Sequence, residues 1–419
     1  MECPSVGNTP YGKLTGEMAD RKFASASLCI LIHLMPMNLL SKITACLAPL
    51  SAVAQLEVTA VNQLPLARAS QTLEIPAKEL AILNAKSLNL IHVEDPTGKE
   101  LICQAIDQDG DALRSFDAVL FQADFAAGET KKFSVTVGAK QIYQKEQYKA
   151  FGRFVRERFD DFAWENDCIA HRTYGKALET WQGEPLTSST IDIWSKRVPR
   201  MVINDWYLVD DYHVDHGEGA DFYSAGPSRG CGGNGLWAND KLWVSKNFIN
   251  SDVLANGPIR VLFELEYAPF DVGGVSVSET KRISLDAGQQ FDRFESHYNI
   301  AGPSVTLTAA IGLKKSASEK LESNLAEGWL VKWEKVEKGG GNQGLAVITG
   351  AKNDNNQVED SLNQLVLAKV DATNIATYWA GFCWDKAGRF TDSESWKKHV
   401  SEFAHGLTSP VEVKIAPSK

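Results

Sequence analysis

Three segments in the second half of the chain decide the fold: RVLFELEY at residues 260–267, VSVSETKRISL at 275–285 and QFDRFESHY at 290–298. Apolar and polar side chains alternate along each segment, and Gly288 supplies a turn between the last two. Alternation with a period of two predicts strands that bury one face. Long consecutive strands of this kind predict an antiparallel sheet that packs against a second sheet as a sandwich.

The sequence on either side of these segments extends the same pattern. Further strands are predicted at residues 305–311, 329–334, 345–348 and 365–370. A single helix is predicted over 393–407, because Trp396, Val400, Phe403 and Leu407 share one helical face. Asp392 or Ser393 is expected to cap this helix. The fold class is therefore mostly β with few helices.

The first half of the chain predicts a smaller β unit of its own. Residues 56–61 alternate, and a turn follows at 95–98. Residues 119–125 and 132–137 lie on either side of Gly128 and predict a hairpin. We therefore expect a small β-sandwich over residues 55–140 and a large antiparallel two-sheet supersandwich over 141–419.

The N-terminus has the features of a targeting segment. A basic start at Met37, a short apolar run and a small-x-small site before Gln55 predict a signal peptide cleaved after Ala54. Residues 1–54 then comprise an upstream extension and the signal peptide, with a lipoprotein signal around Cys46 as an alternative. Lys42 interrupts the apolar run, so no membrane span is expected after processing. The predicted location is periplasmic or secreted.

Composition and charge exclude several classes of protein. The chain has 419 residues, 44% hydrophobic and 23% charged, which is ordinary for a globular protein. A net charge of -10 argues against nucleic acid as a partner, since phosphate requires a basic surface. An anionic sugar could still bind to a protein of this net charge, but only in a pocket that is locally basic.

Four of the seven cysteines follow the predicted cleavage site, at Cys103, Cys168, Cys231 and Cys383. Their wide spacing, with no CxxC pair, argues against a zinc ribbon or a redox motif. One or two disulfides would be compatible with an oxidising compartment, and the sequence does not pair them.

The densest group of reactive side chains is YHVDHGEGADFY at residues 212–223, which follows Asp210 and Asp211. In a lyase, His213 or His216 would remove the C5 proton of a uronic acid, and Tyr212 or Tyr223 would act as the acid.

Two other chemistries compete for the same residues. In a glycoside hydrolase, Glu218 would act with Asp221 or Asp215 across a glycosidic bond. In a metal site, His213, His216 and Glu218 (or Asp215) would ligate a divalent ion. No other cofactor is expected. A polar loop in which the histidines only hold turns remains a further alternative.

Candidate substrate-binding residues surround this segment. Arginines and aromatic residues alternate along 153–167, and a glycine-rich segment follows at 226–235. Guanidinium groups can hold a sugar carboxylate, and flat aromatic faces can stack on sugar rings. The candidates are Arg153, Arg156, Trp164, Asn166, Arg172, Arg229 and Trp379. Surface ion pairs, a glycine turn and core packing are the structural alternatives for these residues.

Three blocks of this sequence, DFAWEND at 161–167, YHVDHGEG at 212–219 and GPSRGCGG at 226–233, resemble the bacterial family catalogued as domain of unknown function 4861. The resemblance covers most of the chain after residue 54. It implies an exported protein associated with the breakdown of plant or algal polysaccharides, often rich in uronic acids. It also implies a supersandwich similar to those of galactose mutarotases and polysaccharide lyases, although a shared fold does not fix function.

The function expected from these observations is an exported carbohydrate-active enzyme that cleaves uronic-acid-containing oligo- or polysaccharides by β-elimination. In that hypothesis Arg229, Asn166 and Arg172 neutralise the sugar carboxylate. A glycoside hydrolase, a non-catalytic carbohydrate-binding protein and a mutarotase-like epimerase are the alternatives.

Overall fold

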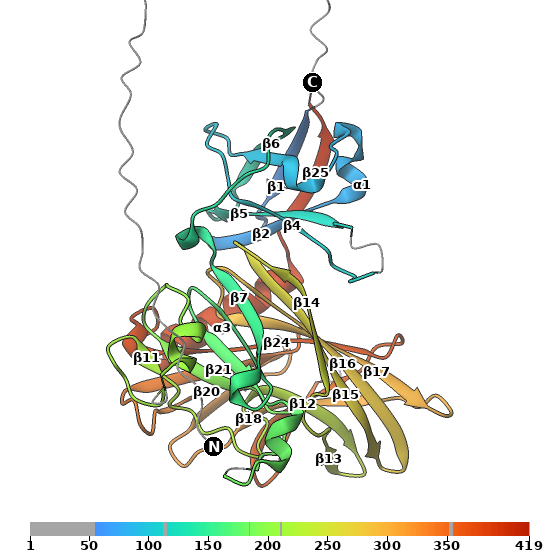
Figure 1. Ribbon diagram of the computed structural model, residues 1–419, viewed down its shortest axis with the longest axis vertical. Helices are drawn as coiled ribbons and strands as arrows, with labels where there is room; N and C mark the ends of the chain where they lie inside the picture. Colours follow the sequence, from blue (N-terminus) through green and yellow to red (C-terminus); the bar gives the residue numbers. More distant parts are fainter. Residues whose placement is uncertain (1–54, 112–114, 184, 210–211, 352–354, 419) are drawn as a thin grey trace, which may run out of the picture. The chain divides into compact units, whose positions relative to one another are not determined.

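The computed structural model describes residues 55–111, 115–183, 185–209, 212–351 and 355–418 (Figure 1). The predicted signal peptide, with its start at Met37 and cleavage after Ala54, therefore lies outside the described residues, as do Asp210 and Asp211. Within the described ranges, the strands form five antiparallel sheets, and helices are few. The predicted fold class is confirmed.

Two sheets with a common hydrophobic core form the small sandwich. One has the strand order β25-β1-β6-β3 and the other β2-β5-β4. Their strands are β1 (Leu56–Val61), β2 (Arg68–Pro76), β3 (Ile91–Glu94), β4 (Cys103–Ile106), β5 (Ala118–Phe125), β6 (Thr130–Val137) and β25 (Glu412–Pro417). Helix α1 (Ala77–Leu80) follows β2. Val58, Phe121 and Phe133 meet in the core between the sheets.

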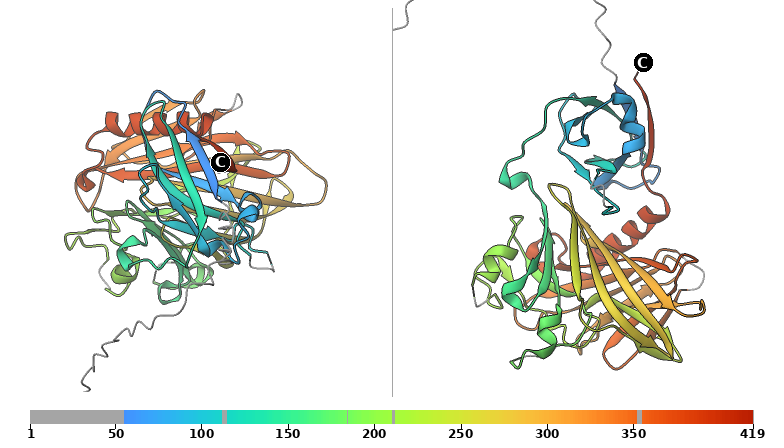
Figure 2. Two further views of the ribbon diagram at one scale, coloured as in Figure 1. Left: turned by 90° about the horizontal axis from the view of Figure 1, so that it is seen from above. Right: turned by 45° about the vertical axis from the view of Figure 1, so that its right-hand side comes forward.

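Two pairings in the small sandwich differ from the sequence prediction. Strands β5 and β6 do not form a hairpin, because each joins a different sheet. The segment 55–140 also does not supply every strand of the small sandwich. The C-terminal strand β25 completes one of its sheets by pairing with β1 (Figure 2). Both pairings depend on contacts that are distant in sequence.

The largest sheet has eight strands in the order β14-β15-β16-β17-β24-β21-β20-β19. They are β14 (Asn250–Asn256), β15 (Arg260–Val272), β16 (Val275–Asp286), β17 (Phe291–Ala301), β19 (Lys320–Asn324), β20 (Trp329–Lys335), β21 (Asn342–Ile348) and β24 (Ile375–Trp384). The alternation predicted along β16 is confirmed, because Val277, Ile283 and Leu285 are all fully buried. These side chains face the inside of the large sandwich.

Two five-stranded sheets share the core of the large sheet. One is ordered β13-β12-β18-β23-β22 and the other β11-β10-β9-β8-β7. The first contains β12 (Cys231–Ala238), β13 (Lys241–Trp243), β18 (Thr308–Lys314), β22 (Asn356–Glu359) and β23 (Asn363–Lys369). The second contains β7 (Ala150–Val155), β8 (Asp161–Asn166), β9 (Ala170–Thr173), β10 (Asp192–Lys196) and β11 (Gly219–Ala220). This second sheet carries most of the candidate site.

Helix α3 (Ser393–Thr408) covers the outer face of the large sheet (Figures 1 and 2). Trp396 and Val400 are fully buried against strand residues that include Ile348. The carboxylate of Asp392 accepts a hydrogen bond from the Ser395 amide, 2.8 Å away, and so caps the helix. The predicted helix and its capping residue are confirmed.

Two further observations bear on the sequence predictions. Cys103, Cys168, Cys231 and Cys383 are all free, so the disulfides considered above are not formed among the described residues. In the same part of the chain, none of the helices has the length and apolar character needed to cross a membrane.

Candidate functional site

A buried guanidinium forms the base of the candidate site. Arg172 lies on β9, directly opposite Asp192 on β10. Its Nε is 2.8 Å from Asp192 Oδ2, and its Nη2 is 2.8 Å from Asp221 Oδ2. A third carboxylate, that of Asp161, lies 3.8 Å from Nη1. Arg172 is therefore already occupied by protein carboxylates, and its predicted role in binding a substrate carboxylate is not supported.

This cluster places more negative than positive charge in the protein interior. Burial raises the pKa of Asp161 to about 7, although Arg172 and Arg158 oppose the shift. Burial, together with repulsion from Asp192, also raises the pKa of Asp221. At least one of these carboxyl groups is consequently expected to retain a proton near neutral pH.

Tyr212 lies directly on this cluster. Its hydroxyl oxygen accepts hydrogen bonds from Arg158 Nε at 2.7 Å and from Arg172 Nη1 at 3.2 Å. Its ring stacks on Trp194, with centroids 5.3 Å apart. Two cationic donors on one phenolic oxygen stabilise negative charge that develops there.

His213 is held beside Tyr212, with ring centroids 4.4 Å apart. Its Nδ1 is 3.0 Å from the backbone carbonyl oxygen of Asp221 and 3.3 Å from Asp221 Oδ2. A carbonyl oxygen only accepts, so we assign the ring proton to Nδ1, which leaves the Nε2 lone pair available. The side chain is 44% exposed.

The protonation state of His213 follows from its surroundings. Burial lowers its pKa below the usual value, and the positive charges of Arg172 and Lys338 act in the same direction. The imidazole is therefore neutral at pH 7, as a general base must be. Lys338, which is exposed, adds a cation near this histidine.

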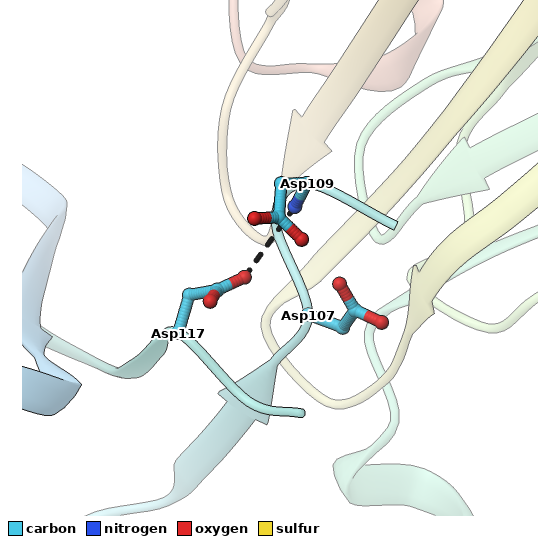
Figure 3. A group of neighbouring side chains, drawn as sticks. All are labelled: Asp107, Asp109 and Asp117. Atoms are coloured by element: carbon cyan, nitrogen blue, oxygen red, sulfur yellow. Dashed lines mark hydrogen bonds between the residues drawn. The ribbon is translucent and has the colours of Figure 1, made fainter. Parts of the chain in front are cut away.

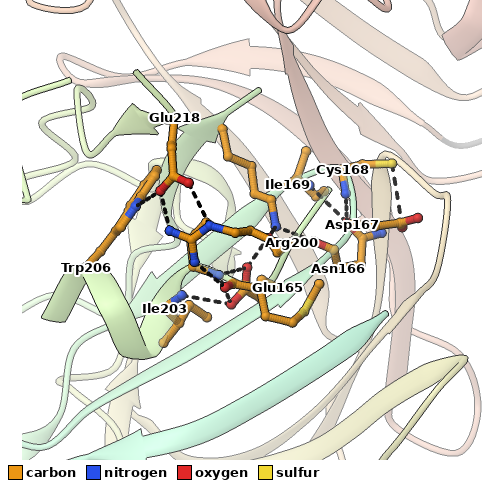
Figure 4. Close-up of polar contacts among 12 residues, drawn as sticks. Glu165, Asn166, Asp167, Cys168, Ile169, Arg200, Ile203, Trp206 and Glu218 are labelled. Atoms are coloured by element: carbon orange, nitrogen blue, oxygen red, sulfur yellow. Dashed lines mark hydrogen bonds and ion pairs between the residues drawn. The ribbon is translucent and has the colours of Figure 1, made fainter. Parts of the chain in front are cut away.

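A cavity of about 310 Å³ adjoins Tyr212. It is lined by Tyr212, His216, Glu218, Trp206 on α2 (Ile203–Tyr207) and neighbouring residues that include Arg200. Arg200 holds Glu218 by two hydrogen bonds, one of 2.6 Å, and Trp206 Nε1 lies 3.5 Å from the same carboxylate (Figure 4). The hydrogen bonds from Arg200 lower the pKa of Glu218, so this carboxyl group is a poor general acid.

Two residues at the end of β8 have separate structural roles: Glu165 holds the start of α2 beside this cavity, and Asn166 fixes a turn away from it (Figure 4). The Glu165 carboxylate is 2.8 Å from Lys196 Nζ and accepts from the amides of Val202 and Ile203 at the start of α2. The Asn166 side chain donates to two backbone carbonyls, and its oxygen accepts from the amide of Cys168 at 2.8 Å. Asn166 therefore fixes a turn, and its predicted contact with substrate is not supported.

The other predicted binding residues do not join the site. Trp164 is fully buried and donates to Asp292 at 2.7 Å. Arg229 is 1% exposed and donates to the hydroxyls of Ser188 and Ser189 inside the sandwich, where no substrate carboxylate can reach it. None of the remaining three lines the cavity: Arg153 is paired with Glu157 and donates to Asn204 on α2 at 2.7 Å, Arg156 is exposed, and Trp379 lines a separate cavity beside α3.

The predicted catalytic residues divide into two groups. Tyr212, His216 and Glu218 line one cavity, whereas His213 packs against Tyr212 and is bonded to Asp221, which is buried and supports it. Tyr223 lines a different cavity. Asp215 shapes the intervening turn by accepting from the amides of Gly217 and Gly219.

The structure adds Asp161, Asp192, Arg158 and Lys338 to the site. The sequence had placed Arg158 and Asp161 in the 153–167 segment, with surface ion pairing as the structural alternative, whereas Asp192 and Lys338 were not among the candidates. The pairing of β9 with β10 brings Asp192 to Arg172, and nothing in the local sequence marks this register.

The proposed metal ligands His213, His216 and Glu218 do not come together. In the part of the chain that the structure describes, the group of three ligating side chains within mutual reach is Asp107, Asp109 and Asp117 (Figure 3). These carboxylates, on the connection between β4 and β5, could hold a hard cation such as Ca²⁺. They are not part of the candidate site.

Comparison with known proteins identifies relatives that cover most of the chain. Residues 61–413 match the family model described as domain of unknown function 4861. Uncharacterized protein P7 of Formosa agariphila is 32% identical over 374 residues, which cover 85% of this chain and 93% of that protein.

Solved structures show a more distant likeness. An alpha-mannosidase from Enterococcus faecalis V583 superposes with a TM-score of 0.50 at 11% identity, over 87% of this chain and 46% of the mannosidase. This chain thus spans less than half the length of that enzyme. At this identity the likeness concerns the fold alone.

Proposed function

Since the chain belongs to the family described as domain of unknown function 4861, its activity has to be inferred from its own side chains, and we propose that it is an exported lyase. Its substrates are uronic-acid-containing oligo- or polysaccharides, and its reaction is β-elimination at the site of Tyr212 and His213. The distant likeness to a mannosidase is compatible with a carbohydrate substrate.

One observation carries this proposal. Nδ1 of His213 is bonded to a carbonyl oxygen, so the half-exposed ring presents Nε2 as a base beside a tyrosine hydroxyl that two guanidinium groups hold. A base, a hydroxyl acid and cations are the groups that proton abstraction next to a carboxylate requires.

In the proposed reaction, Nε2 of His213 takes the C5 proton of the uronate. The C5–H bond breaks, a C4=C5 double bond forms, and the C4–O bond breaks. Tyr212 gives its proton to the departing glycosidic oxygen, and Arg158 and Arg172 stabilise the phenolate that remains. Lys338 is placed to offset the charge that builds up on the sugar carboxylate. Proton transfer from His213 to Tyr212, directly or through water, restores both groups.

The test is a screen of the chain from Gln55 onward against uronate-containing poly- and oligosaccharides, which records absorbance near 235 nm and reducing ends together. We expect both signals to rise, and His213→Ala and Tyr212→Phe to lower turnover by about 10²–10⁴-fold, the usual contribution of one general acid or base. His405→Ala, at a comparably exposed histidine (47%), is the matched control and should retain activity.

Absence of a 235 nm signal on every uronate polymer would exclude β-elimination on those substrates. Reducing ends without absorbance would favour the hydrolase alternative, with Glu218 as the next residue to change. Binding without turnover would favour a carbohydrate-binding protein.

A further inference from the structure

A cavity of about 360 Å³ lies where the small sandwich meets the large one, and it shares no lining residue with the cavity beside Tyr212. Its walls come from β2, from β15, β16, β17 and β24 of the eight-stranded sheet, and from the second half of α3. The two sandwiches touch here, since Arg260 on β15 lies 2.6 Å from Glu74 on β2. Ligand sites are frequent at such junctions, and this volume is typical of them.

One part of the wall is apolar and carries an accessible tryptophan. Trp379 on β24 is partly exposed, and Phe403 and Leu407 of α3 line the same cavity. In the described chain Nε1 of Trp379 has no hydrogen-bond partner, yet it is not buried, unlike the indole nitrogens of Trp194 and Trp396. A flat apolar ring with a free N–H suits a sugar, which has an apolar face and hydroxyl groups around its edge.

The carboxylates on the wall already have cationic partners. Asp286 is held by Arg260, with Nε and Oδ1 2.6 Å apart, and Glu402 lies 3.6 Å from Lys398. His399 also lines the cavity, but burial lowers its pKa to about 4, so it carries no charge at neutral pH. These groups therefore leave little negative charge to repel an anionic ligand.

Two guanidinium groups on the wall have no carboxylate partner among the described residues. Arg68 donates to the carbonyl oxygens of Ser409 and Gly406, and Nη1 of Arg389 donates to that of Gly288 at 2.8 Å. Arg389 is exposed and Arg68 is partly exposed. Nε of both arginines and Nη2 of Arg389 make no hydrogen bond within the described chain, so these N–H groups can donate to a ligand.

The positive charge of this cavity contrasts with the rest of the protein. The whole chain has a net charge of -10, so a basic cavity does not follow from its composition. Guanidinium groups bind carboxylates well, because their N–H groups match the two oxygens. A cavity with both this charge and an accessible tryptophan suits a ring-shaped ligand that bears a carboxylate.

We propose that this cavity binds an acidic saccharide, with one sugar ring against Trp379 and its carboxylate held by Arg68 and Arg389. The anionic, ring-shaped character of the ligand follows from the cavity, whereas the choice of a uronate sugar rests on the proposed function. The site would hold a uronate chain at a place other than the one where it is cleaved.

The experiment measures binding of trisaccharides of D-galacturonate and of D-glucuronate by titration calorimetry. Maltotriose serves as a neutral sugar and succinate as an anion without a sugar ring. The chain from Gln55 onward carries His213→Ala, so that turnover does not consume the ligand. We expect Arg389→Gln to raise the dissociation constant of the acidic trisaccharide about tenfold, the loss of one charge-assisted hydrogen bond, without changing that of maltotriose. Trp379→Phe should weaken both kinds of sugar about two- to tenfold.

Two substitutions outside the cavity are the matched controls. Arg156→Gln removes another exposed arginine. Trp333→Phe changes another partly buried tryptophan that packs on the same hydrophobic cluster as Trp379. Both should bind the acidic trisaccharides as the parent chain does, and thermal unfolding checks that every variant is folded.

The outcomes separate this inference from the proposed function. If Arg389→Gln and Trp379→Phe leave affinity unchanged while Tyr212→Phe weakens it, the sugar binds only at the Tyr212 site, and the inference is wrong while the proposed function stands. Weaker binding in Arg389→Gln and Trp379→Phe, in a protein that turns over no uronate polymer, would support the inference and count against the lyase. Succinate binding as tight as that of the trisaccharides, or no measurable binding of either trisaccharide, would overturn the inference.

Discussion

At the scale of single residues, the site depends on how an arginine is surrounded rather than on its presence. Arg172 looks like a substrate contact in sequence, but its nitrogens meet Asp192, Asp221 and Asp161 inside the protein. It therefore positions Tyr212, and through Asp221 also His213. An arginine with several buried carboxylate partners is a structural element of the site.

Replacing this arginine should therefore affect stability as well as activity. We expect Arg172→Met to lower the free energy of unfolding by about 3–5 kcal/mol, because it leaves buried carboxylates without a cation. Urea unfolding at neutral pH measures the change. Arg153→Met removes contacts with Glu157 and Asn204 near the surface and should cost clearly less than Arg172→Met. Equal effects of the two changes would show that the Arg172 cluster contributes no special stability.

Asp161 should make stability depend on pH. Its pKa is about 7 in the folded chain and about 3.9 when unfolded. Between these values the folded state holds a proton that the unfolded state releases, so stability should fall as pH rises from about 4 to 7. Urea unfolding across this range should show that Asp161→Asn removes part of the decline, whereas Asp205→Asn, at an exposed position, does not.

The pH dependence of turnover should reflect His213. Because burial lowers the pKa of this residue, its imidazole stays neutral below the ordinary value of about 6.5. The acidic limb of kcat/KM should accordingly have its midpoint below pH 6.5. A midpoint clearly above that value would be incompatible with His213 as the base.

At the scale of elements, periodicity was sufficient for the parts of the fold that depend on local sequence. The alternation of β15 to β17 and the apolar stripe of α3 predicted those elements correctly. The supposed hairpin of β5 and β6 was wrong, because periodicity does not specify which strand lies alongside which. For the same reason, the contact between Asp192 and Arg172 could not be predicted from the sequence. It depends on the register in which β9 pairs with β10.

The clustering in the 212–223 segment was visible in sequence because the reactive residues are close neighbours along the chain. Arg229, by contrast, faces the sandwich interior, and only three-dimensional burial reveals that it is inaccessible.

Helix α3 provides a prediction at this scale. Asp392→Ala removes the carboxylate that accepts from the Ser395 amide, and it should lower the free energy of unfolding. Asp392→Ser keeps a capping oxygen and should cost less. Chemical unfolding measures both variants, and equal losses would mean that the cap itself contributes little.

At the scale of the whole molecule, the first and last strands of the described chain belong to one sheet. Strand β1 is paired with β25 on one side and with β6 on the other, from Leu56 opposite Pro417 to Val61 opposite Glu412. Deletion of residues 410–419 should therefore expose an edge of β1 and reduce amide-exchange protection in β1 and β6. Removal of Lys419 alone is the control, and unchanged protection after the larger deletion would contradict this view.

The pairing of β1 with β25 also has a consequence for the order in which the protein can be made and folded. The amide of Ser418 donates to the carbonyl oxygen of Gln55 at 2.8 Å, so a segment more than 350 residues later in the sequence completes the sheet that contains β1. While the ribosome is still synthesising the chain, β1 lacks this neighbour. The small sandwich can reach its final form only after residues 412–418 have been translated, and the nascent chain remains incompletely folded until then.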